Sequence, residues 1–267
     1  MKGFQPPYSF HHCFRLGVFL LEQLVFPSKC LKCGVYLSPE PFKNQGMDCF
    51  FCGACFSDGI TPVEPPFCTV CGKMFKSRSG GNHVCGACLQ TPGFLGMVRA
   101  CAVYEGIVKE AVPLFKYNAK LSLLTAFEPM MADGFLRYFN GSGIDVVMPV
   151  PLHKKKLKQR GFNQAYLLVR HLRRCMKRET GRTPEWTLDS RSFMRKKMTL
   201  PQTGFDTMQR KQNLDRAFEV THPHAVKGRH VLLIDDVYTT GATCNEAAKT
   251  LLKAGAERVD ALVLART

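Results

Sequence analysis

Two adjacent aspartates followed by a hydroxyl-rich loop have the clearest chemistry in this sequence. The apolar run VLLI leads into Asp235 and Asp236, and the letters TTGAT follow at 239–243. Paired carboxylates suit two neighbouring hydroxyl groups or a hard divalent cation. Backbone N–H groups at the start of a helix, together with the threonine hydroxyls of TTGAT, favour a phosphate. Carboxylates that can bind hydroxyl groups stand beside a loop that can bind a phosphate, and this combination predicts a sugar phosphate as the ligand.

Cysteines form the second set of residues with recognisable chemistry. The sequence has 13 of them, and eight make four C-x-x-C pairs between positions 30 and 88. Each pair can place two thiolates on one knuckle, and two knuckles complete a tetrahedral zinc site of four sulfurs. An interleaved pairing is possible, and Cys49 and His83 are near enough to substitute. Sequential pairing predicts one site from Cys30, Cys33, Cys52 and Cys55 and another from Cys68, Cys71, Cys85 and Cys88.

These pairs are expected to be closed, structural zinc sites, one or two in number, because every ligand would be a protein group. A disulfide scaffold is the competing interpretation, and it would require an oxidising compartment. The segment FRLGVFLLEQLVFP at 14–27 superficially resembles a signal-peptide core. It contains Glu22 and Gln23 and lacks an A-x-A-like cleavage site, so it does not support export.

The same segment is predicted to be an amphipathic helix that packs on the body of the protein, with contact to a membrane surface as the alternative. No apolar run reaches 18 residues, so no transmembrane segment is expected. The expected location is the cytoplasm, with peripheral attachment at the inner face of the cytoplasmic membrane as a further option.

The charge of the chain is strongly positive and uneven. The 267 residues have a formal net charge of +16, and residues 153–197 hold 15 basic against 3 acidic side chains. Such a field favours polyanions, namely nucleic acid, pyrophosphate or an anionic membrane surface. A basic face without a partner is the alternative. The hydrophobic fraction of 45% excludes wholesale disorder.

The elements that must position these residues alternate along the second half of the chain. Strands are predicted at 97–104, 144–150, 230–236 and 258–266, with 187–195 as a further candidate. Helices are predicted over 106–116, 121–139, 163–178 and 242–256. This alternation predicts an α/β fold with a mostly parallel sheet flanked by helices. The predicted parts are an N-terminal helix (1–29), a cysteine-rich zinc module (30–95) and the α/β domain (96–267).

The stretch VLLIDDVYTTGAT resembles the phosphoribosyl pyrophosphate (PRPP) motif of type I phosphoribosyltransferases. The resemblance implies that Asp235 and Asp236 hold the ribose hydroxyls, that the loop holds the 5-phosphate, and that magnesium bridges pyrophosphate and ribose. The motif residues expected to contact the ligand besides the aspartates are Val237, Thr239, Thr240, Gly241, Ala242 and Thr243.

Three further segments are similar to those of the ComF family: VYEGIVKEAVPLFKY (103–117), VMPVPLHKKKLKQRGFNQA (147–165) and RKKMTLPQTGFDTMQRKQNLDRAF (195–218). The resemblance covers nearly the whole chain and implies a double zinc ribbon before a type I phosphoribosyltransferase domain. It places pyrophosphate at the loop after MPVP. The three lysines at 154–156 lie in this loop, and a solvated basic loop without a ligand is the alternative interpretation for them. The candidates near pyrophosphate are Pro149, Pro151, Arg160 and Asn163, and the segment that could fold over the site carries Arg195, Lys196, Lys197 and Arg210.

Two functions follow from this resemblance. The first is a PRPP-binding protein with a role in DNA uptake or utilisation, which contacts single-stranded DNA through its basic surface. The family is associated with an inner-membrane DNA channel and a helicase, which are the expected protein partners. The alternative is an active phosphoribosyltransferase with an unassigned acceptor. For that reaction the candidate catalytic residues are Asp235, Asp236, Arg160 and Lys197.

Overall fold

The computed structural model describes residues 27–37, 46–77, 79–197 and 216–267. They fall into two compact units, one ending at Gly59 and the other beginning at Ile60. The predicted cysteine-rich segment 30–95 is therefore shared between the units. Arg210 and, apart from Pro27, the predicted helix at 14–27 lie outside the described residues.

The first unit contains two cysteine knuckles and little regular structure. Its described helical element is the short 3-10 turn η1 (Met47–Cys49). The N–H of Gly34 donates to Cys30 O at 2.9 Å and closes the first knuckle. Among its described residues only Cys30, Met47 and Phe51 are buried hydrophobics. A core this small indicates that the folded state of the unit depends on a link between its cysteines, through a metal ion or disulfides.

The second unit is built on a parallel sheet of five strands in the order β1-β7-β6-β2-β3. The central strand β6 pairs Ile234 with Leu262 of β7 and with Pro149 of β2. Its first five residues are all buried, as expected for a parallel strand that is covered on both faces. The predicted α/β class with a mostly parallel sheet is confirmed. The strands are β1 (Val98–Val103), β2 (Val146–Pro149), β3 (Thr187–Leu188), β6 (His230–Tyr238) and β7 (Arg258–Arg266).

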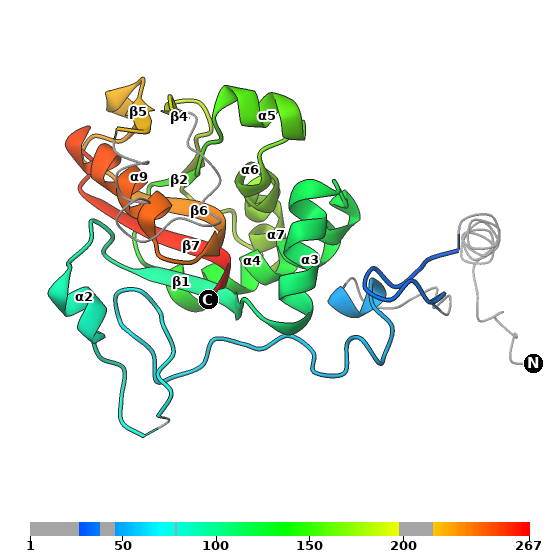
Figure 1. The fold of residues 1–267 in the computed structure, drawn as a ribbon. Helices are drawn as coiled ribbons and strands as arrows, with labels where there is room; N and C mark the ends of the chain where they lie inside the picture. The colour runs from blue at the N-terminus through cyan, green and yellow to red at the C-terminus, as the bar shows by residue number, and fades with distance from the viewer. Residues whose placement is uncertain (1–26, 38–45, 78, 198–215) are drawn as a thin grey trace, which may run out of the picture. The chain divides into compact units, whose positions relative to one another are not determined.

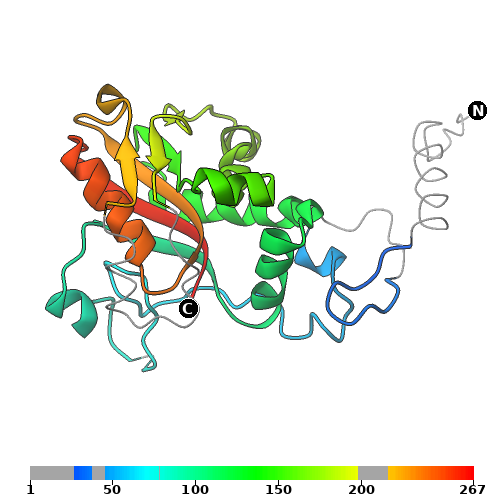
Figure 2. The same ribbon diagram turned by 45° about the horizontal axis from the view of Figure 1, so that its top comes forward.

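Helices cover both faces of this sheet, as Figures 1 and 2 show. One face carries α4 (Leu124–Phe139) and α6 (Gln164–Val169), with α7 (Leu172–Thr180) packed against α4. The opposite face carries α9 (Ala242–Lys253). The helix α3 (Gly106–Tyr117) begins soon after the carboxyl end of β1. Within the described ranges, no helix is long and apolar enough to cross a membrane.

The structure corrects two predictions, one of a single helix and one of a loop. The segment 163–178 forms α6 and α7 rather than one helix, and the chain turns at Arg170 and His171 between them. The loop predicted after MPVP soon becomes the short helix α5 (Lys154–Arg160). His153 caps this helix, because its Nδ1 atom accepts the N–H of Lys155 at 3.3 Å. The three lysines at 154–156 therefore begin a helix beside the carboxyl edge of the sheet.

The candidate strand at 187–195 is divided between two sheets. Its first part is β3 of the main sheet, and its last part is β4 (Phe193–Arg195), which pairs antiparallel with β5 (Phe218–Val220). The Asp189 carboxylate accepts the N–H groups of Arg191 and Ser192 at 2.8 and 3.0 Å. This aspartate turn redirects the chain and separates the two strands.

Candidate functional site

The two aspartates lie near the carboxyl end of β6 and face opposite sides of the sheet, as neighbouring residues of a strand do. Asp235 is on the side of α9, where the Cys244 sulfur lies 3.9 Å from its Oδ2 atom. Asp236 is on the side of α3, and Lys116 Nζ lies 2.7 Å from its Oδ1 atom. The strand end therefore presents one carboxylate on each side of its backbone.

The two oxygens of Asp236 are used unequally. This residue is 3% exposed. Its Oδ1 atom contacts Lys116 and accepts the N–H of Val237 at 2.6 Å. Its Oδ2 atom is buried and has no hydrogen-bond partner among the described residues. Such an unsatisfied oxygen costs on the order of 1–3 kcal/mol. A bound hydroxyl group or hard cation would remove that cost without displacing Lys116.

Asp235 titrates with a pKa far above the usual range of an aspartate. Burial and then the charge of Asp236 raise the pKa of Asp235 to about 7, although Lys116 and Arg195 limit the rise. Burial by itself would lower the pKa of Lys116, but the Asp236 carboxylate outweighs burial and the pKa is raised. Asp235 therefore changes charge near neutral pH, while Lys116 stays protonated.

Further cations surround the acid pair. The pKa of Lys156 in α5 is lowered by burial first and then by the positive charges of Arg160, Arg195 and Lys116. These four side chains therefore share one electrostatic neighbourhood. The guanidinium carbon of Arg160 lies 5.2 Å from the centre of the Tyr117 ring, which joins the end of α5 to the end of α3. Four cations against two carboxylates leave an excess of positive charge that suits a polyphosphate.

The TTGAT loop joins β6 to α9. Thr239 and Thr240 are exposed, and Ala242 and Thr243 are the first residues of α9. Gly241 is the N-cap of this helix with a φ of 76°, a left-handed conformation that glycine adopts without strain. Backbone N–H groups of the first helical turn and the positive end of the helix dipole lie at this loop. It can therefore hold a phosphate.

Replacement of Gly241 by alanine is expected to destabilise the protein by about 2–4 kcal/mol, because backbone strain and steric overlap add. A Cβ atom here would lie 2.1 Å from the Tyr238 hydroxyl oxygen. Gly181 has a φ of 71° but no heavy atom within 4 Å of its Cβ position, so Gly181→Ala is the matched control. It should cost only about 1–2 kcal/mol. Urea unfolding compares the two variants, and equal losses would contradict the overlap with Tyr238.

The residues predicted to contact pyrophosphate lie at the end of β2 and after it, but they differ in whether their side chains are available for a ligand. Pro149 ends β2 and Pro151 follows it. The Asn163 side chain accepts an N–H of the first turn of α6 at 3.0 Å and donates to Val150 O at 3.1 Å. Its amide therefore holds the turn in place. Arg160 is the member of this set that lies close to the other cations of the site.

The basic residues after β4 also differ. Arg195 lies close enough to Asp235 for the two charges to interact, whereas Lys196 Nζ pairs with Glu219 of β5 at 2.6 Å. Lys197 is exposed. Lys116 was not among the predicted site residues. It belongs to the segment LFKY, and nothing in the pattern of that segment indicates that α3 carries this lysine to Asp236.

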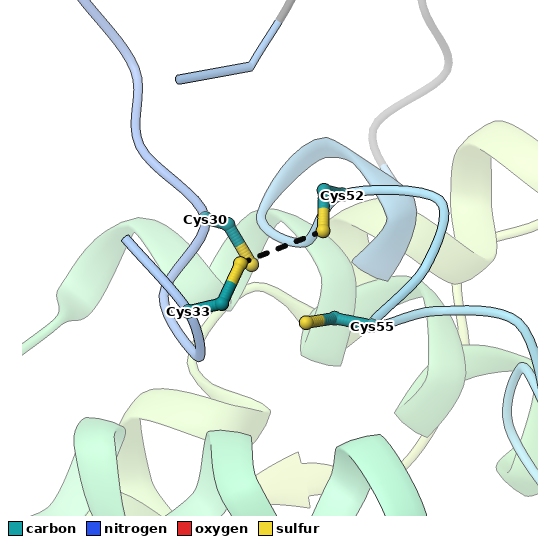
Figure 3. A group of neighbouring side chains, drawn as sticks. All are labelled: Cys30, Cys33, Cys52 and Cys55. Carbon is teal, nitrogen blue, oxygen red and sulfur yellow. Dashed lines mark hydrogen bonds between the residues drawn. The ribbon is translucent and has the colours of Figure 1, made fainter. Parts of the chain in front are cut away.

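The eight paired cysteines form two groups, and in each group the four sulfur atoms lie within 4.8 Å of one another. The grouping is the sequential one. In the first group, drawn in Figure 3, the Cys33 and Cys52 sulfurs are 3.6 Å apart. In the second group, the Cys71 and Cys85 sulfurs are 3.9 Å apart. Tetrahedral zinc with Zn–S bonds of about 2.3 Å requires sulfurs about 3.8 Å apart. Both groups therefore fit structural zinc.

One cysteine of each group has a lowered pKa, which favours its thiolate form. Burial raises the pKa of Cys30 and of Cys68, but backbone N–H donors outweigh burial and lower both values to about 6. The Cys68 sulfur accepts two such N–H groups at 3.3 and 3.4 Å. Cys49 and His83, the substitute ligands considered above, belong to neither group. The His83 ring instead stacks on Phe75 at 4.0 Å.

A cavity of about 1070 Å³ lies between the second cysteine group and the TTGAT loop. Its wall on the cysteine side includes Val70, Leu95 and Val98, and its wall on the loop side includes Thr239 and Thr240. This volume is in the range of sites for small ligands. The cavity therefore offers a mostly apolar space directly beside the loop.

Two family models of known proteins match the cysteine region and the region that contains the TTGAT loop. A family model of a double zinc ribbon domain matches residues 21–89, and a model of a phosphoribosyl transferase domain matches residues 189–267. These matches define a protein with a phosphoribosyltransferase domain behind a double zinc ribbon.

Similar proteins, two of them matched over most of the chain, identify the family within this class of protein. The chain is 30% identical to DNA utilization protein YhgH of Escherichia coli K12, across 91% of this chain and 99% of that protein. It is 28% identical to competence protein ComFC of Bacillus subtilis, across 82% of this chain and 95% of that protein. Over 123 residues, 46% of this chain and 50% of the relative, it is 37% identical to competence protein F of Haemophilus influenzae. The chain belongs to the ComF family.

Proposed function

We propose that this chain binds PRPP at the carboxyl edge of its sheet and serves in DNA uptake or utilisation. The observation that carries the proposal is that a carboxylate pair, a helix-opening threonine loop and an excess of cations meet near the end of β6. Ribose hydroxyls, a 5-phosphate and a pyrophosphate are the three polar parts of PRPP. Each part has a matching group here.

The assignment of groups follows from their chemistry. The two aspartates would face the ribose hydroxyls, with Asp236 Oδ2 accepting one of them, and the loop 239–243 would surround the 5-phosphate. Charge-assisted contacts to pyrophosphate would come from the cations. Magnesium bound with PRPP would lie against the carboxylate pair and would neutralise pyrophosphate charge. The cations in question are Lys156, Arg160, Arg195 and, beyond β4, Lys197.

Titration calorimetry of the full chain with PRPP and magnesium tests the proposal. Saturable binding that weakens when magnesium is omitted is the expected result. Ribose 5-phosphate, which lacks the pyrophosphate, is the control ligand and should bind at least about tenfold more weakly, because it forgoes the charged contacts. Absence of binding at millimolar PRPP would overturn the proposal.

The affinity for PRPP is expected to fall as the pH drops below about 7, the pKa of Asp235 in the free protein. Ligand contacts favour the charged carboxylate, so binding below that pH must release a proton, and affinity declines by up to about tenfold per unit. Above it the carboxylate is already charged and this dependence disappears. Phosphate groups titrate near pH 6, so the range from about 6.5 to 8.5 is informative. Calorimetry in buffers of different ionisation enthalpy counts the protons, and none released at about pH 6.5 would contradict the assignment.

Contact with single-stranded DNA is a second candidate function, favoured by the surface of α7. Arg173, Arg174, Lys177 and Arg178 are exposed on this helix. Arg174, Lys177 and Arg178 line a groove of about 550 Å³ beside α4. Relatives of this chain carry the names DNA utilization protein and competence protein. Exposed cations along a groove suit a sugar–phosphate backbone without reading its sequence.

Fluorescence anisotropy with labelled oligodeoxythymidine tests this contact. Affinity should fall steeply between about 50 and 300 mM salt, because counterions are released on binding. Arg174→Glu with Arg178→Glu should weaken binding at least about tenfold. The double variant Lys227→Glu with Arg229→Glu makes the same charge change at exposed positions before β6 and should have a much smaller effect. Negligible or salt-independent binding would exclude this function.

Transfer of phosphoribose is the catalytic alternative, and the cavity beside the loop favours it by providing space for an acceptor. In this reaction a nucleophile forms a bond to C1 of the ribose, and pyrophosphate leaves with the electron pair of the broken C1–O bond. The leaving group would be stabilised by Lys156, Arg160, Arg195 and Lys197. Release of pyrophosphate from PRPP with magnesium, measured with and without nucleobases, separates transfer from binding alone.

A further inference from the structure

The first link between the second cysteine group and the TTGAT loop runs through Asn245. Cys85 precedes the short helix α2 (Gly86–Gln90), which contains Cys88, and the chain then leads to Phe94. The N–H of Phe94 donates to Asn245 Oδ1 at 3.0 Å, and Asn245 Nδ2 donates to Gly241 O at 3.1 Å. One partner is a donor and the other an acceptor, so the orientation of the amide is determined. Asn245 thus joins Gly241 to Phe94, which lies 151 positions before Asn245 in the sequence.

A second link runs through Arg266 at the end of β7. Its Nη1 atom donates to the backbone oxygen of Cys71. Its guanidinium carbon lies 5.7 Å from the centre of the Tyr238 ring, a cation–π distance. The Tyr238 hydroxyl fills the space in which a side chain at Gly241 would lie. The first link therefore starts at Phe94, shortly after Cys88 in the chain, the second starts at Cys71, and both lead to Gly241.

The second cysteine group is itself held firmly on the sheet. The N–H of Val98 donates to Val70 O at 2.7 Å, and Arg99 Nη2 donates to Thr69 O at 3.0 Å. Gly72 approaches β1 so closely that a Cβ atom would lie 2.7 Å from Val98 O. A displacement of this knuckle would therefore be transmitted to β1 and, through the two links, to the loop.

We infer that the second cysteine group positions the TTGAT loop, with Asn245 and Arg266 as positioning residues. The first group belongs to the other compact unit and serves as the comparison. The inference rests on the proposed function of this loop as the phosphate site. Amide groups of a phosphate loop must be held in place before the ligand arrives, since ordering them on binding lowers affinity. The two links provide that order from outside the loop.

Asn245→Ala tests the first link in the full, zinc-loaded chain. We expect PRPP affinity to fall about tenfold, because two hydrogen bonds are lost, and the amides of 241–243 to exchange hydrogen faster while those of β6 do not. Thr250→Ala is the matched control on the same helix. Its hydroxyl donates to Glu246 O at 2.9 Å, a bond within α9, so it should change neither quantity. Unchanged exchange at 241–243 in Asn245→Ala would overturn the inference.

Paired cysteine variants test the difference between the two groups. Cys85→Ser with Cys88→Ser should accelerate exchange at 241–243 and weaken PRPP binding, whereas Cys52→Ser with Cys55→Ser should do neither. Equal effects of the two double variants would overturn the inference. If the second-group variant loses protection throughout β6, its result reflects unfolding, and Asn245→Ala decides. Failure of the unaltered chain to bind PRPP would reject the proposed function, and the exchange measurement would still decide the positioning role.

Discussion

Replacement of Asp235 and Asp236 together by asparagine should weaken PRPP binding by at least about a hundredfold at about pH 8. Asparagine keeps the shape of aspartate but removes both negative charges, and each hydrogen bond to a charged group contributes roughly 1.5–3 kcal/mol. The loss should be largest in the presence of magnesium, because the carboxylates also face the cation in the proposed arrangement. Calorimetric titration of the double variant with PRPP and magnesium measures the effect.

The interpretation of this result depends on the state of Lys116. Its ammonium group lies against Asp236 in a position where the lysine side chain is 18% exposed. Removing the anion leaves that cation without its partner, which is destabilising. A triple variant that adds Lys116→Met removes the ammonium group that has lost its partner. If it melts like the unaltered chain and still does not bind PRPP, the loss belongs to the site and not to the fold.

A surface aspartate provides the matched control. Asp133 pairs with Arg137 at 2.7 Å on α4, and its side chain is 66% exposed. Asp133→Asn makes the same chemical change away from β6 and should leave PRPP affinity within about twofold, since exposed ion pairs contribute little. A folded Asp235/Asp236 double variant with full affinity would show that PRPP does not bind at this strand end.

The fold class and the strand–loop–helix stretch could be predicted because local pattern and chemistry agree there. An apolar run that is buried on both faces, two acids and a glycine with left-handed backbone are all features of neighbouring residues. The sequential grouping of the cysteines was predicted for the same reason, since each knuckle is a local structure. The divisions at Arg170 and Asp189 were missed. At Asp189 the carboxylate accepts two backbone N–H groups and turns the chain, whereas nothing in the periodicity of 163–178 indicates the turn at Arg170.

Other parts of the site depend on contacts between distant residues and could not be predicted. Lys116 reaches Asp236 only because α3 ends beside the carboxyl edge of β6. The spacing of C-x-x-C pairs determines a knuckle but not the body on which the knuckle packs. The second group belongs to the unit that contains the sheet, whereas the first belongs to the unit that ends at Gly59. Asn245 has no sequence pattern that indicates its bond to Phe94.

Removal of metal from the cysteine groups should unfold the first unit and leave the sheet of the second unit folded. Structural zinc contributes apparent binding free energies of about 10–16 kcal/mol, which exceeds the stability of most small domains. The first unit has three buried hydrophobic residues among those described, so little else can hold it together. The strands β6 and β7 are buried among many apolar side chains and do not require the metal.

Hydrogen exchange before and after chelation measures both parts of this expectation. Amides of residues 30–37 and 46–59 should lose protection, those of β6 and β7 should keep it, and those of 239–243 should become intermediate if the second group positions the loop. Restored zinc should reverse the change, whereas magnesium should not, because it does not favour thiolate ligands. Cys175→Ser, which changes a cysteine of α7 outside both groups, should have no effect. If chelated protein with no remaining zinc kept protection at 30–37, disulfides or packing rather than metal would stabilise the first unit.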